Sequence, residues 1–181
     1  MALVPAVVDV VSPIPVIAAG GIADGRGLAA VLALGAVGAW IGTRFLASEE
    51  ASMHPDYRKR VLEGTAAETA YTTLWDADWP GAPHRVLRNS TMAAWESSGR
   101  PPSGKRPGEG EALTTDAAYG FTALRYECRT ARSDWEGDVE AFPLWAGQGV
   151  GLVNRIQPAG EIVREIAEDA QRILKRLAES S

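Results

Sequence analysis

Several features that define whole classes of protein are scarce in this sequence of 181 residues. It holds one cysteine, Cys128, so an internal disulfide is impossible and a reducing, cytoplasmic setting is expected. Acidic residues outnumber basic ones by 23 to 18, and a nucleic-acid-binding protein would need a basic face instead. No apolar run approaches the roughly 20 residues of a membrane span. These absences favour a globular protein without nucleic-acid or membrane partners.

Signatures of metal binding and of acid–base catalysis are also scarce. The sequence has two histidines, His54 and His84, and neither belongs to a His/Cys cluster with metal-ligand spacing. His54 precedes Pro55 at the expected start of a helix and is interpreted as a capping or surface residue. His84 is interpreted as an ordinary loop residue, with a place beside a substrate channel as the less favoured alternative. We therefore predict no metal site and assign neither histidine a catalytic role.

What the sequence does contain is a strand–turn–helix–strand pattern near its start. Residues 14–19 form a continuous apolar run, typical of a strand buried on both faces of a parallel sheet, and residues 39–42 form a second, shorter strand. Between them a helix is predicted, with Asp24 as its N-cap, Leu34 near its end and Gly35 as its C-cap. Such a unit is expected to be parallel and right-handed.

A glycine turn follows each of these two strands. Gly20 and Gly21 follow the first, and Gly42 with Thr43 follows the second. Glycine lets main-chain N–H groups converge on an anion without side chains in the way, and a following helix adds its positive N-terminal end. Arg44 is expected to neutralise charge there. The pattern favours a phosphate site over the alternative, in which the glycines only form tight turns.

Four segments carry a resemblance to a known family. They are PVIAAGGIADGRGLAAVLALGAVGAWIGTRFLASEEA (15–51), HPDYRKRVL (54–62), WPGAPHRVLRN (79–89) and LWAGQGVGLV (144–153). Together they resemble the nitronate monooxygenases, formerly called 2-nitropropane dioxygenases, a family that includes flavin-dependent enoyl-acyl-carrier-protein reductases. The resemblance implies a TIM-type barrel with noncovalent FMN, which oxidises alkyl nitronates with dioxygen, and it leaves an oligomer open.

The resemblance also implies which residues bind the cofactor. Gly21 is expected at the FMN phosphate, Gly20 is the neighbour that the turn requires, and four residues close around the phosphate: Trp40, Ile41, Gly42 and Thr43. Gln148, in the Ala-Gly-Gln-Gly segment, is carried over only weakly as a residue near the flavin or substrate.

The family's catalytic histidine is expected just before a Leu-Val-Pro stretch, and this chain begins with that stretch at residues 1–5. No catalytic residue is therefore expected in it. One alternative is an inactive truncated fragment or another non-catalytic product. A second alternative keeps the fold but makes the protein an enoyl-acyl-carrier-protein reductase or another phosphate-binding barrel.

The predicted fold class is α/β, the C-terminal portion of a TIM-type (β/α)8 barrel that is incomplete in this chain. Residues 1–70 are expected to form its last βα units with the FMN phosphate site. Residues 71–147, rich in Trp and Pro, are expected to be irregular, with a flexible loop at 100–110. Residues 148–181 hold the Ala-Gly-Gln-Gly segment and a C-terminal helix that packs on the barrel.

Overall fold

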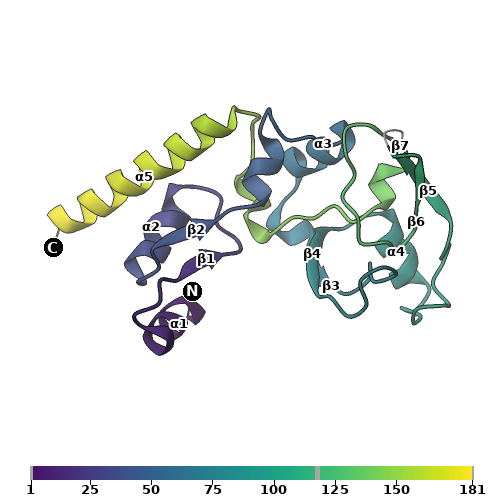
Figure 1. Cartoon of the computed structure of the whole chain (residues 1–181), viewed down its shortest axis with the longest axis horizontal. Coiled ribbons are helices and arrows are strands. Elements are labelled where there is room, and N and C mark those ends of the chain that lie inside the picture. The colour runs from purple at the N-terminus through teal and green to yellow at the C-terminus, as the bar shows by residue number, and fades with distance from the viewer. Residues whose placement is uncertain (1, 117–118, 181) are drawn as a thin grey trace. The chain divides into compact units, whose positions relative to one another are not determined.

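The computed structural model describes residues 2–116 and 119–180 and has a mixed α/β fold (Figure 1). The chain divides into two compact units. Unit 1 comprises Met1–Ala51 and Gln148–Ser181, and unit 2 comprises Ser52–Gly147. Unit 2 thus begins ahead of the boundary predicted at residue 70. Within the described residues, no helix has the length and apolar character needed to cross a membrane.

Unit 1 contains the predicted strand–helix–strand motif. Its elements are α1 (Leu3–Val11), β1 (Ile17–Ala19), α2 (Gly25–Ala33), β2 (Gly38–Trp40), α5 (Ala159–Glu179) and two 3-10 helices, η1 (Thr43–Ala47) and η4 (Gln148–Leu152). β1 and β2 are parallel, as predicted, with Ala18 opposite Ala39. In the described part of unit 1 the sheet has these two strands and does not close into a barrel.

The ends of α2 lie where the sequence predicted them. The Asp24 carboxylate caps the helix by accepting a hydrogen bond from the Gly27 N–H at 3.1 Å. Gly35 follows the helix with a φ of +94°, a conformation that glycine adopts without strain. The helix covers the sheet with small side chains, and the buried core here consists of Ala18, Val31 and Ala36.

The long helix α5 packs against α2 in unit 1. Ile162, Ile166 and Ala170 of α5 are buried, whereas Leu177 near its end is exposed. The two helices approach so closely that a Cβ built on Gly25 would lie 2.5 Å from the Cβ of Asp169. The N-terminus of α2 therefore requires a residue without a side chain at this crossing.

Unit 2 is more regular than the sequence suggested. Its elements are α3 (Pro55–Glu63), η2 (Ala66–Glu68), β3 (Thr69–Thr72), β4 (His84–Leu87), α4 (Ser90–Ser97), β5 (Ala112–Asp116), β6 (Phe121–Leu124), β7 (Trp135–Gly137) and η3 (Val139–Ala141). β3 pairs with β4, and a second antiparallel sheet has the order β6-β5-β7. These strands are too short for a period of two residues to stand out in the sequence, so packing rather than local pattern defines them.

Loop 100–110, which was expected to be flexible, is anchored by a buried arginine. The Arg106 guanidinium donates hydrogen bonds to the Leu74 carbonyl at 2.8 Å and to the Asp76 carboxylate at 2.6 Å, and it also pairs with Glu109. It lies over the Tyr126 ring, 4.1 Å from the centroid. Composition alone did not reveal this anchor, because Leu74 and Asp76 are about thirty residues away.

The two histidines have different surroundings. The His54 ring accepts a hydrogen bond from the Asp56 N–H, which confirms the predicted cap of α3. His84 is not a loop residue: it begins β4, is buried, and lies against Trp75 and Trp145, with ring centroids 6.0 and 4.8 Å away. Burial lowers the pKa of His84 and so favours its neutral form.

Candidate functional site

The two predicted glycine turns lie at one end of the parallel strand pair in unit 1. Gly20 and Gly21 follow β1 with φ angles of +94° and +72°, and Gly42 follows β2 as the N-cap of η1. Because Ala19 lies opposite Trp40 in the register, both turns leave the sheet at the same edge. The positive φ angles explain why glycine is required at positions 20 and 21.

The main chain of these turns is open to a ligand. A Cβ built on Gly20, Gly21 or Gly42 would meet no atom within 4 Å, and all three residues are exposed. Apart from their chain neighbours, no residue therefore lies against these three positions. Main-chain N–H groups at exposed turns are ligands that phosphate sites commonly use.

The residues from the end of β2 to the start of η1 have varied surroundings. Trp40 is 74% exposed, whereas Ile41 lines an apolar cavity of about 250 Å³ together with residues that include Leu28 and Phe45. Thr43 begins η1 directly after Gly42. Thr43 is the one of these residues whose side chain has a hydroxyl suited to an anion.

Gly149 of the Ala-Gly-Gln-Gly segment packs directly on the first glycine turn. A Cβ built on Gly149 would lie 3.1 Å from the Gly21 carbonyl oxygen and 3.2 Å from the Ala23 Cβ. Gln148, the exposed first residue of η4, is consequently brought beside the turn that contains Gly21. The sequence singled out this segment by its resemblance, but it gave no signal that Gly149 is needed for this close approach.

A carboxylate already occupies the N-terminus of α2. Besides capping the helix, Asp24 pairs with Arg26 at 2.5 Å. Burial alone would raise the pKa of Asp24, but hydrogen bonds from Arg26 and the Gly27 N–H outweigh burial and lower it. The positive end of α2 was expected to attract a phosphate. In the structure this end is instead capped by the protein's own carboxylate, Asp24.

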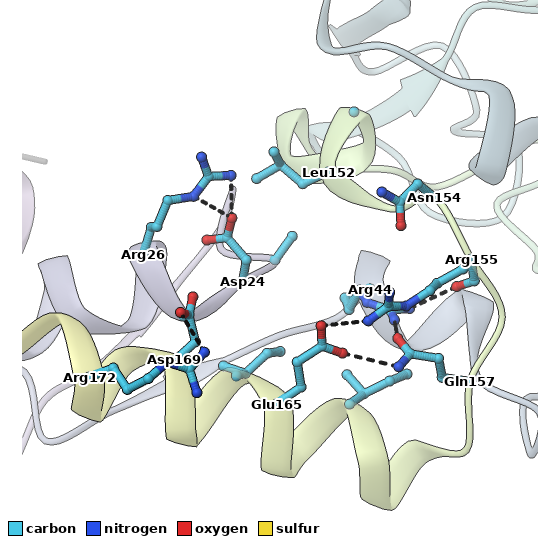
Figure 2. Close-up of a pocket in the computed structure, with 15 residues that line it drawn as sticks. Asp24, Arg26, Arg44, Leu152, Asn154, Arg155, Gln157, Glu165, Asp169 and Arg172 are labelled. Carbon is cyan, nitrogen blue, oxygen red and sulfur yellow. Dashed lines mark hydrogen bonds and ion pairs between the residues drawn. The ribbon is translucent and has the colours of Figure 1, made fainter.

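Arg44 does not extend as the free counter-charge that the sequence suggested. It is buried, and its guanidinium donates hydrogen bonds to the Arg155 carbonyl at 3.3 Å and to the Gln157 side-chain oxygen. Gln157 and Arg155 in turn donate to the Glu165 carboxylate of α5 at 3.0 and 2.6 Å. These groups line a polar cleft of about 400 Å³ in unit 1, where Figure 2 shows Arg44 beside Arg155 and Gln157.

The sequence did not reveal this cluster. Arg44 and Gln157 are separated by 113 positions, and neither belongs to a motif that pairs them. Within residues 2–116 and 119–180, no group of three or more His, Cys, Asp or Glu side chains is arranged to hold a metal ion.

Comparison with known proteins identifies the family. A family model described as nitronate monooxygenase matches residues 1–169. The chain belongs to the nitronate monooxygenase family. The predicted resemblance is thus confirmed, and this is a family of flavin-dependent oxidoreductases.

Individual relatives agree with the family model. The chain is 37% identical to nitronate monooxygenase npaC of Metarhizium robertsii over 184 residues, which cover 96% of this chain and 47% of that protein. It superposes on FabK from Thermotoga maritima with a TM-score of 0.72 and 31% identity, covering 99% of this chain and 51% of FabK. Nitroalkane oxidase from Streptomyces ansochromogenes gives a TM-score of 0.66 and 28% identity, covering 97% and 44%.

The similarity covers nearly all of this chain but only part of each relative. The chain spans about half the length of the proteins it matches. FabK and nitroalkane oxidase are TIM-barrel enzymes, and the two parallel strands of unit 1 agree with that fold class.

Proposed function

We propose that this chain binds FMN by its phosphate at the two glycine turns of unit 1 and acts in an oxidoreductase that oxidises alkyl nitronates with dioxygen. One observation carries the proposal. Two bends of open main chain leave adjacent parallel strands at the same edge, and a Cβ at Gly20, Gly21 or Gly42 would meet no atom within 4 Å. In a complete barrel, the loops after the last two strands are the usual phosphate site.

The residues at the turns suit a phosphate. In this proposal Gly20, Gly21, Gly42 and Thr43 supply main-chain N–H groups, and Thr43 adds its hydroxyl. Ile41 borders the apolar cavity described above, so it contributes through its main chain. Trp40, the last residue of β2, is exposed beside Ile41 in the sequence. When bound, FMN supplies the redox chemistry, and the protein's part is to hold and orient it.

Gln148 is the residue of η4 proposed to reach the flavin or the substrate. It is exposed, and its neighbour Gly149 is packed against the Gly21 carbonyl. A side-chain amide both donates and accepts hydrogen bonds, which suits either the polar edge of a flavin or a nitronate oxygen.

We assign no proton-transferring residue to this chain. His54 is engaged as the cap of α3, and the His84 ring is enclosed by Trp75 and Trp145.

The test introduces a charge at the second turn. Gly42→Asp places a carboxylate where phosphate oxygens are proposed to bind, and repulsion between like charges is expected to weaken FMN binding by at least ~100-fold. Flavin content is measured by absorbance after gel filtration, and affinity by quenching of flavin fluorescence.

Gly42→Ala is the matched control. The φ of Gly42 is −102° and its Cβ would enter open space, so alanine is expected to retain FMN. Normal flavin content in Gly42→Asp would refute the phosphate site.

The proposed substrate is tested by oxygen consumption with an alkyl nitronate, using the flavin-loaded protein. Nitronate-dependent oxygen uptake supports the proposed reaction. A yellow protein that instead oxidises a reduced nicotinamide with an enoyl thioester supports the reductase alternative. A colourless protein supports the non-catalytic one.

A further inference from the structure

We propose that Arg44 is a positioning residue, which fixes the start of η1 and thereby the second half of the phosphate site without contacting the phosphate. The inference rests on the proposed FMN site and extends it to a residue outside that site. Arg44 directly follows Thr43, so a change in its position is transmitted at once to Gly42 and Thr43.

The Arg44 side chain points into the protein. Only 6% of the residue is exposed, and its guanidinium donates to the Arg155 carbonyl and to the Gln157 side-chain oxygen. A direct phosphate ligand would offer these N–H groups to solvent before the ligand binds. Here they are used within the protein, in the polar cleft of Figure 2.

The main chain at Gln157, the partner of Arg44, is itself fixed by hydrogen bonds. Gln157 forms a parallel bridge with Ser48, its N–H donates to the Ala47 carbonyl at 3.3 Å, and its carbonyl accepts from the Glu49 N–H at 3.0 Å. Residues 47–49 and residue 157 therefore form a small ladder of main-chain hydrogen bonds. The side chain of Arg44 joins the beginning of η1 to this ladder.

The partners of Arg44 are also held by the helix α5. Glu165 accepts hydrogen bonds from Gln157 and Arg155, and the Glu50 carboxylate accepts from the Ala159 N–H at 2.8 Å. Arg44 thus reaches partners that the longest helix of unit 1 holds in place. An arginine suits this task because its planar guanidinium serves two acceptors at once, whereas a lysine ammonium on a flexible stem orients neither.

The energetics make the contact costly to remove. Burial lowers the pKa of Arg44, but an arginine side chain remains charged in proteins. The buried cation is therefore stabilised by the oxygen atoms that accept its hydrogen bonds. Without Arg44, the Arg155 carbonyl and the Gln157 side-chain oxygen would lose a charged donor. The start of η1 is then expected to shift, and an error of about 1 Å in a binding cradle is enough to weaken it.

The test compares FMN with riboflavin, which lacks the phosphate. In the full chain, Arg44→Met is expected to weaken FMN binding by ~10-fold, which corresponds to the loss of one charged hydrogen-bonding contact. Riboflavin binding is expected to stay unchanged within ~2-fold. Arg44→Lys is expected to recover part of the FMN affinity. Arg164→Met is the matched control, because Arg164 is an exposed arginine of the same unit.

A second readout does not depend on flavin. Amide hydrogen exchange in segments 42–50 and 153–159 is expected to quicken in Arg44→Met and to stay unchanged in Arg164→Met. If Arg44→Met is too unstable to purify, Gln157→Met removes the same contact from the other side. It is expected to give the same selective loss of FMN affinity and the same faster exchange.

The outcomes separate the two proposals. If the unmodified chain prefers FMN to riboflavin and Arg44→Met retains that preference, the positioning role is wrong and the phosphate site stands. Equal losses of FMN and riboflavin affinity would also overturn it, because they would indicate general destabilisation. If the unmodified chain does not prefer FMN, the phosphate site itself is wrong and the role assigned to Arg44 fails with it.

Discussion

The two units differ in where their large apolar side chains lie. Unit 2 encloses a set of bulky side chains completely, which includes Tyr57, Trp75, Tyr126 and Phe142, although Trp79 remains exposed. Unit 1 has a core of small and aliphatic residues and leaves larger ones exposed, among them Leu3, Ile17, Val37 and Trp40. Parallel strands are normally covered on both faces, so the exposure around β1 and β2 is the unusual feature.

The difference indicates what holds each unit together. Unit 2 depends on a dense core of aromatic rings and on the buried guanidinium of Arg106. Unit 1 depends on the packing of α2 against α5 and on the hydrogen bonds that join η1 to Gln157. The fully buried aromatic side chains are therefore concentrated in unit 2, and the exposed main chain proposed for FMN binding lies in unit 1.

The largest expected effect compares one tryptophan from each unit. Trp75 is fully buried, so Trp75→Ala is expected to cost ~3–5 kcal/mol of unfolding free energy by leaving a cavity. Trp40 is 74% exposed, and Trp40→Ala is expected to change stability by no more than ~0.5 kcal/mol. Urea denaturation of the flavin-free protein measures both. Equal costs would contradict the difference drawn between the units.

An intermediate effect tests the close approach of η4 to the glycine turn. In Gly149→Ala the new methyl group would meet Gly21 and Ala23 at 3.1–3.2 Å, and such overpacking is expected to cost ~1–3 kcal/mol. FMN affinity should fall as well, because the Gly21 turn must shift to make room.

Gly160→Ala is the matched control for this prediction. Its Cβ would have Arg164 at 3.8 Å as its nearest contact, so stability and FMN affinity should both be retained. A Gly149→Ala protein with unchanged FMN affinity would show that η4 does not constrain the turn.

The smallest expected effect is a pH dependence in unit 2. Hydrogen bonds from Arg106 lower the pKa of Glu109 from 4.5 to about 2, although burial acts in the opposite direction. Because the folded-state pKa is depressed, this contribution to stability is complete above pH 4.5 and is lost as the pH falls toward 2. Glu109→Gln should therefore lose less stability than the unmodified protein between those pH values. Parallel denaturation curves of the two proteins would contradict it.

The sequence predicted unit 1 well because its signals are local. Asp24 and Gly35 mark the ends of α2 within a few residues of the helix itself, and the two apolar runs are of the kind that pairs in parallel. In unit 2, His54 and Pro55 marked the start of α3 by a local signal of the same kind. Each of these signals reflects a local preference of the main chain.

Unit 2 and the surroundings of the site depend on contacts between distant residues. His84 was read as a loop residue because the adjacent prolines suggest a turn, but Trp145 and Trp75 enclose it in β4. Arg44 was read as a counter-charge because it follows a glycine turn, but its partner is Gln157. Single-sequence patterns carry no information on such pairings.

The most direct test follows the amide signals of the turns in the ¹⁵N-labelled chain during titration with FMN and with riboflavin. We expect FMN to shift the amide signals of Gly20, Gly21, Gly42 and Thr43, because the phosphate accepts their hydrogen bonds, and riboflavin to leave them in place. If FMN binds while those four amides stay unchanged, the phosphate is held elsewhere and the proposed site at the glycine turns is wrong.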